Sequence, residues 1–120
     1  MKKIGDCVRQ GDVLLIRASA KTVTPHHHSV PREGGRVVVA VGETSLHAHV
    51  MRDPSVCMLA REGVSDRVLT VGADLVTLML EGGESAPGVP RHGSIDVPGG
   101  TYIVRTQREW SGQEVLNAQD

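Results

Sequence analysis

Residues 36–51 read RVVVAVGETSLHAHVM, and their pattern indicates the fold class. Its first part, residues 36–41, is almost pure valine, which favours a strand buried on both faces. Gly42 closes that strand, and residues 43–45 turn the chain. Residues 46–51 then alternate between apolar side chains and histidine, the period of two that is typical of a strand. The stretch therefore predicts two strands joined by a short turn.

The rest of the chain repeats this pattern of short apolar segments bounded by turn residues. Further strands are predicted at 12–17, 56–60, 68–71, 75–80, 94–97 and 101–107, with breaks at 72–74 and a tight turn at Pro98-Gly99-Gly100. No segment has the 3.6-residue apolar period of an amphipathic helix. Such regular spacing is typical of barrels and sandwiches, so we predict an all-β fold: one small β-barrel or jelly-roll domain over residues 1–120.

Three segments are too polar or too rich in proline and glycine for strands. We expect long loops near 18–35 and 81–93. The last residues, 111–120, are expected to be flexible or to pair as a final strand.

Composition excludes several classes of partner. The 13 Lys plus Arg nearly balance the 14 Asp plus Glu, giving a net charge of -1, so no broad attraction to nucleic-acid phosphates is expected. One Trp, one Tyr and no Phe leave little surface for stacking bases. No apolar run approaches the roughly 18 residues that a membrane span needs, and residues 1–6 lack a signal-peptide core. We expect a cytoplasmic protein, or a virion protein if it is phage-encoded, with no nucleic-acid or membrane partner.

Cys7 and Cys57 belong to no C-x-x-C pair, so the sequence has no zinc-ribbon or thioredoxin-like signature. Small free cysteines are commonly core residues, and we expect both thiols to be buried. The sequence leaves open whether they pair.

The histidine pair is the most pointed chemical feature. His47 and His49 share one face of the predicted strand, about 6 to 7 Å apart, close enough to converge on one ion at roughly 2.0 to 2.1 Å from each ring nitrogen. A third ligand must come from elsewhere, and His92, Asp53 and Glu43 are the candidates. His92 is the first choice, because three histidines with one open position commonly bind zinc, iron or nickel. Without an ion, the pair would lie on the solvent face of a half-exposed strand, or take a metal-free acid-base or hydrogen-bonding role.

Two other clusters have simpler explanations. The run His26-His27-His28 has a metal-binding composition, but on a loop it is expected to be a solvated cluster. Residues 107–110 end the last strand, where the Trp110 ring is expected to cap the barrel in preference to a catalytic Arg108/Glu109 pair. No nucleophile elbow and no phosphate-binding loop pattern occurs.

Three stretches carry a resemblance to known proteins. Residues 10–15 (QGDVLL), 42–49 (GETSLHAH) and 98–110 (PGGTYIVRTQREW) resemble uncharacterised small bacterial and phage-encoded proteins that read Q-G-D-V-L-L, G-E-x-T-G-H-x-H and P-x-G-x-Y-x-V-x-x-Q-R-E-Y. Leu46 stands in place of a glycine in the second stretch, and Trp110 in place of a tyrosine in the third. That resemblance supports the predicted fold and the choice of candidate residues but implies no reaction.

The chain more distantly resembles the cupin or RmlC-like jelly rolls. Their G-x5-H-x-H-x3,4-E and P-x-G-x2-H-x3-N stretches supply metal ligands, and the resemblance implies those roles for His47, His49 and His92. Gly42 stands one residue too close to the first histidine, and Asp53 occupies the acidic position in place of glutamate.

We therefore predict a small metal-binding β-barrel protein in which His47, His49 and His92 hold a divalent Zn, Fe, Ni or Mn ion. Glu43 or Asp53 would serve as fourth ligand or base. If the protein is an enzyme, a metal-assisted hydrolytic, isomerising or oxygen-using reaction on a small molecule fits. The alternative is a non-enzymatic structural or interaction module, such as a phage-type accessory or capsid-decorating protein. A homo-oligomer is expected in either case.

Overall fold

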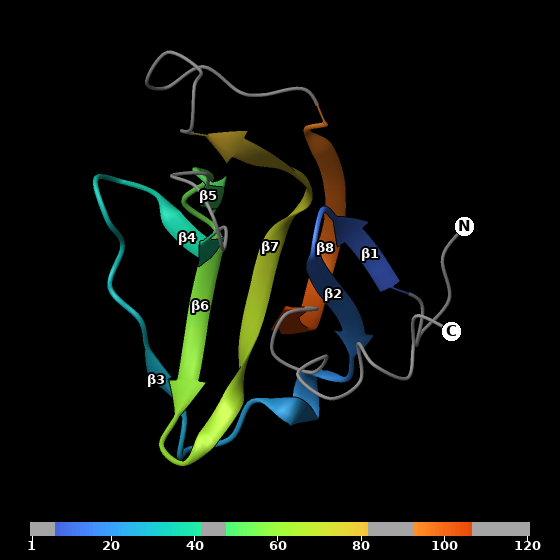
Figure 1. Ribbon diagram of the computed structural model, residues 1–120. Coiled ribbons are helices and arrows are strands. Elements are labelled where there is room, and N and C mark those ends of the chain that lie inside the picture. The colour runs from blue at the N-terminus through green and yellow to red at the C-terminus, as the bar shows by residue number, and fades with distance from the viewer. Residues whose placement is uncertain (1–6, 42–47, 82–92, 107–120) are drawn as a thin grey trace, which may run out of the picture.

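The computed structural model describes residues 7–41, 48–81 and 93–106. These residues form one antiparallel sheet of eight strands (Figure 1). The elements are β1 (Cys7–Gln10), β2 (Val13–Ala18), a 3-10 turn η1 (Ala20–Thr22), β3 (His28–Ser29), β4 (Val37–Val41), β5 (Ala48–Met51), β6 (Val56–Arg61), β7 (Val64–Glu81) and β8 (Ile95–Thr106). The prediction of an all-β fold is confirmed.

Two long strands organise the sheet. The order is β1-β2-β8-β7-β5-β4, with β6 also paired to β7 and β3 paired to β6. β8 pairs with β7 from Arg67↔Val104 to Leu78↔Ile95. On the other side of β7, β6 pairs with its first part and β5 with its last part. The sheet is bent into two halves, and β7 and β8 each run through both of them.

The bend lies where β7 carries extra residues. Residues 72–74 lie opposite the single residue Gly99 of β8, and such a bulge bends the strand that contains it. A Cβ at Gly99 would overlap the carbonyl oxygen of Ala73. The predicted strand breaks at 72–74 and the predicted turn at 98–100 are therefore wrong, because these glycines allow close approach of two continuous strands and do not end them.

We expect Gly99→Ala to lower the free energy of unfolding by about 3 kcal/mol, because the added methyl group meets rigid backbone. Gly63 has φ +81° and nothing near its Cβ position, so Gly63→Ala carries only a backbone penalty of about 1 kcal/mol. Chemical denaturation of both variants measures the difference. Equal losses would contradict a steric role for Gly99.

The valine-rich strand β4 lies at one end of the sheet order. Val37 and Val39 are buried, Val38 and Ala40 are half-buried, and Val41 is exposed. The prediction that this strand is buried on both faces is wrong. An edge strand of an antiparallel sheet needs only one covered face.

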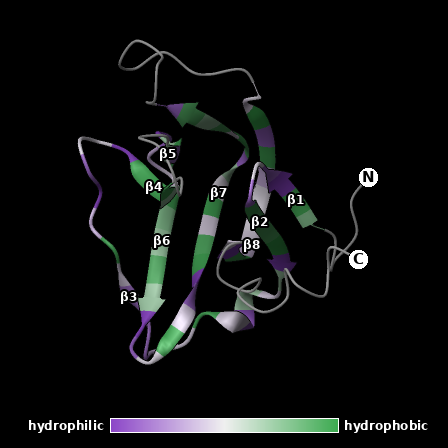
Figure 2. Ribbon diagram, viewed as in Figure 1, coloured by the Kyte–Doolittle hydropathy of each residue, from purple (hydrophilic) through white to green (hydrophobic). Residues whose placement is uncertain are grey.

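The core lies between the two halves of the bent sheet. Its most buried side chains come from β2, β5, β6, β7 and β8: Leu15, Met51, Met58, Leu69, Leu78, Val97 and Tyr102. Figure 2 shows hydrophobic residues predominating along β6. β1 and β4 stand at opposite ends of the order, so the pairings among the described strands leave the sheet open and do not close it into a barrel.

The predicted loops and the two cysteines differ in part from what the structure has. The first predicted loop contains η1 and β3, and β3 pairs with β6. Most of the loop predicted at 81–93 and the whole of 107–120 lie outside the described residues. Cys7 and Cys57 form no disulfide with each other, Cys57 is half-buried and Cys7 is exposed, so the prediction of a buried thiol is wrong for Cys7. In the part of the chain that is described, no helix has the length and apolarity needed to cross a membrane.

Candidate functional site

The structure describes two of the five predicted site residues, His49 and Asp53. His47, His92 and Glu43 lie outside the described residues, so the convergence of three histidines stays a prediction. Within the described ranges, no group of three or more His, Cys, Asp or Glu side chains is arranged to hold a metal ion.

Asp53 closes the turn between β5 and β6. The backbone N–H of Ser55 donates to Asp53 Oδ1 at 2.8 Å, which forms an Asx turn. Hydrogen bonds from Ser55, together with the nearby Arg32 guanidinium, hold the pKa of the Asp53 carboxyl below its ordinary value. Its carboxylate is thus engaged in local structure.

His49 is buried on β5, with 3% of its surface exposed. The expectation of a solvent-facing ring, which was one of the two metal-free alternatives, is wrong for this histidine. Its Nδ1 lies 2.7 Å from Gln10 Oε1, and its Nε2 lies 3.8 Å from Asp12 Oδ1. Each ring nitrogen therefore faces an oxygen atom from the β1–β2 hairpin.

Gln10 determines which nitrogen of that ring carries the proton. Its Nε2 donates to the carbonyl oxygens of Leu78 at 3.0 Å and Gly93 at 2.9 Å. Carbonyl oxygens only accept, so the amide orientation is fixed and Oε1 faces His49. An amide oxygen also only accepts, so Nδ1 of His49 must be the donor. In the neutral ring, Nε2 is then the basic nitrogen.

The β1–β2 turn presents both hairpin residues to the ring. Gln10 pairs with Val13, leaving a two-residue loop of Gly11 and Asp12. Gly11 has φ +61°, and no residue other than glycine has positive φ in the described chain, as in a type II′ turn. A Cβ at Gly11 would lie 3.5 Å from Cε1 of His49, so the turn backbone packs directly against the imidazole.

The pair formed by His49 and Asp12 can act in two ways. A separation of 3.8 Å is too long for a direct hydrogen bond. It suits a single ion lying roughly 2.0 to 2.2 Å from Nε2 and from the carboxylate oxygen, or an ion pair when the ring is protonated. The Asp12 side chain is 36% exposed while that of His49 is 4% exposed, so the pair reaches solvent through Asp12.

The other histidine run takes a structural place. The backbone N–H of Thr24 donates to His27 Nδ1 at 3.0 Å, and His28 begins β3. The expectation of a surface cluster agrees with the exposure of His26 and His28. The predicted cap at residues 107–110 lies outside the described residues.

Gln10 and Asp12 are not among the site residues predicted from the sequence. A signal was present, because both lie in the QGDVLL stretch and His49 lies in the GETSLHAH stretch. The contact between Gln10 and His49 joins these two stretches, which are far apart in the chain.

A family model described as a domain of unknown function, DUF8820, matches residues 9–107. The match includes Gln10, Asp12 and His49. No curated protein and no solved structure matches the chain.

Proposed function

The chain belongs to DUF8820, a family of domains of unknown function, and we propose that this protein binds a divalent metal ion with His49 as the central ligand. The observation that carries the proposal is the hydrogen bond of 2.7 Å between His49 and Gln10. Metal-binding histidines almost always donate their other ring N–H to a fixed acceptor, which orients the ring and sets its tautomer. Gln10 supplies such an acceptor.

Asp12 is the second ligand of the proposed centre. Its Oδ1 lies on the Nε2 side of the ring, at 3.8 Å. Imidazole nitrogen and carboxylate oxygen together suit Zn, Fe, Ni or Mn. A bound ion of this kind would act as a Lewis acid toward water or a small molecule.

The further ligands proposed are His47 and His92. His47 precedes His49 by two positions, so a continued strand would present both rings on one face. His92 is the neighbour of Gly93, whose carbonyl oxygen lies 2.9 Å from Gln10 Nε2. Since the other end of the same amide contacts His49, the backbone next to His92 is tied to the candidate centre. This connection supports the choice of His92 over Glu43 and Asp53.

The test is metal content and affinity in protein purified without a histidine tag. We expect about one ion per chain in the wild type by plasma mass spectrometry, and at least about 100-fold weaker Zn or Ni binding in His49→Gln. Asp12→Asn should weaken binding by about 10- to 100-fold. His28→Gln is the matched control, because that histidine is exposed on β3 and should leave binding unchanged.

Circular dichroism of each variant separates loss of ligand from loss of fold. Equal and negligible metal in the folded wild type and in His49→Gln would overturn the proposal. The hydrogen bond of His49 would then serve only to hold β5 against the β1–β2 hairpin, as expected for a structural or interaction module.

A further inference from the structure

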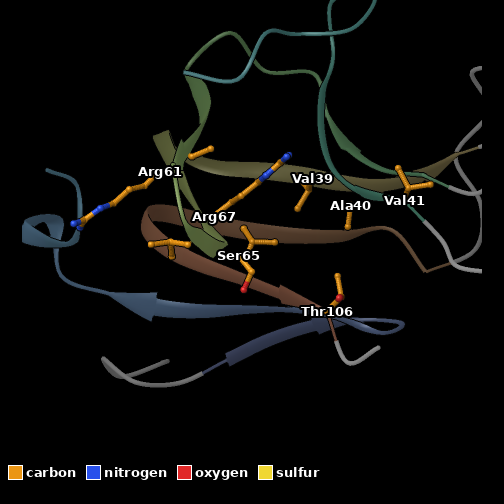
Figure 3. Close-up of a pocket in the computed structure, with 10 residues that line it drawn as sticks. Val39, Ala40, Val41, Arg61, Ser65, Arg67 and Thr106 are labelled. Atoms are coloured by element: carbon orange, nitrogen blue, oxygen red, sulfur yellow. The ribbon is translucent and has the colours of Figure 1, made fainter. Parts of the chain in front are cut away.

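A second candidate site is a pocket of about 480 Å³ between β4, the β6–β7 hairpin and the end of β8 (Figure 3). Its apolar lining includes Val39, Val41, Val64 and Val104. The pocket shares no residue with the proposed metal centre, so a ligand bound there would not depend on the metal ion. Its volume lies within the roughly 300 to 1,000 Å³ typical of small-molecule sites.

The arginines at this pocket differ from the others in the described chain. Arg9, Arg17, Arg32, Arg36, Arg52 and Arg105 each donate a side-chain hydrogen bond to the protein. Within residues 7–41, 48–81 and 93–106, the two arginines whose side chains make no hydrogen bond or ion pair are Arg61 and Arg67, and both line the pocket. A guanidinium without a protein partner next to an apolar surface is suited to an external anion.

The side chains of Arg61 and Arg67 point in different directions (Figure 3). The Arg67 side chain extends across the pocket toward β4, whereas Arg61 points away from the labelled β4 residues. Ser65 lies two positions from Arg67 on β7 and therefore faces the same side of the strand. Val104 is the cross-strand partner of Arg67 on β8. Ser65 and Val104 are thus the neighbours of Arg67 on that face of the sheet, one along β7 and one across to β8.

We propose that this pocket binds a small aliphatic carboxylate. The carboxylate would pair with the planar guanidinium of Arg67, whose fork of N–H donors matches two carboxylate oxygens. The aliphatic tail would lie against Val39, Val64 and Val104, where removal of its surface from water contributes the rest of the affinity. The lining residues include no aromatic side chain, so a base or an aromatic ring would find no stacking partner.

Titration with sodium octanoate tests the proposal. Binding is measured by calorimetry and by NMR shifts of the methyl groups of Val39 and Val104. We expect saturable binding to the wild type and at least about tenfold weaker binding to Arg67→Met, which keeps an unbranched apolar side chain but loses the guanidinium. Arg61→Met is the matched control, and its affinity should stay within about twofold of the wild type. Octanol, which has the same tail without the charge, should bind more weakly than octanoate.

Both substitutions remove side chains that hold no other residue in place, so both variants are expected to fold. The proposal is overturned by the absence of saturable octanoate binding below about 10 mM, or by equal affinities of the wild type and Arg67→Met. Equal binding of octanol and octanoate, or shifts confined to residues away from the pocket, would overturn it as well.

Discussion

Replacing Glu81 by alanine should lower the free energy of unfolding by about 3 kcal/mol, because its buried carboxylate holds two partly exposed arginines and a hydrogen bond to a charged group contributes about 1.5 to 3 kcal/mol. Glu81 ends β7 and is 3% exposed. Its carboxylate accepts from Arg36 Nη1 at 2.9 Å and from Arg52 Nη2 at 3.0 Å. Val37 and Met51 are cross-strand partners, and the next residue outward on each side is Arg36 or Arg52. Removal of the carboxylate therefore leaves two like charges opposite each other.

Urea denaturation at neutral pH measures this loss, and Asp66→Ala provides the matched control. Asp66 pairs with Arg105 at 2.6 Å, but both side chains are partly exposed, at 30% and 38%. An ion pair in contact with water contributes about 1 kcal/mol or less. If Asp66→Ala cost as much as Glu81→Ala, burial of the Glu81 carboxylate would not be the source of its larger contribution.

The contribution of Glu81 should also depend on pH in one direction. Burial alone would raise the pKa of its carboxyl, but hydrogen bonds from Arg36 and Arg52 outweigh burial and hold the pKa below the ordinary 4.5. A depressed pKa in the folded state means that the stabilisation is complete above the unfolded value and is lost as pH falls through the folded value. Glu81→Gln should therefore remove part of the wild-type loss of stability below pH 4.5. Parallel pH profiles for the wild type and Glu81→Gln would contradict this.

The sequence was sufficient to predict the fold class because valine content and an alternating period act locally. It failed at 72–74 and 98–100 because glycine is typical both of turns and of close approach between strands. Only the register, which puts Ala73 against Gly99, separates these two meanings. The Glu81 cluster was unpredictable for the same reason, because its three residues come from separate strands or their ends.

The candidate site was predictable in part. His49 stood out through its spacing from His47, a property of one strand. Gln10 has no local property that marks it, since its role comes from carbonyl groups of residues 78 and 93 and from a ring on another strand. A polar residue next to a glycine turn is expected at the surface, whereas Gln10 is 6% exposed. The burial of an amide in such a turn is the physical sign that the sequence could not supply.

Replacing Gln10 by leucine should therefore have two large effects. The first is a loss of about 3 kcal/mol in the free energy of unfolding, because Nδ1–H of His49 and the carbonyl oxygens of Leu78 and Gly93 all lose a hydrogen-bond partner. The second is a loss of about 10- to 100-fold in metal affinity, because the ring is no longer oriented by an acceptor. Urea denaturation and Zn titration measure the two effects separately.

Gln10→Glu separates the two roles of this amide. A carboxylate still accepts from Nδ1–H of His49, and in carboxylate-histidine-metal arrangements it makes the ring a better ligand. It cannot donate to Leu78 and Gly93, so stability should fall while metal affinity is kept.

In metal-free wild-type protein at neutral pH, nitrogen NMR of the His49 ring should find the proton on Nδ1, and Gln10→Leu should shift that tautomer balance toward Nε2. A wild-type ring protonated only at Nε2 would refute the assignment of Nε2 as the metal-binding atom, whatever the metal content of the protein.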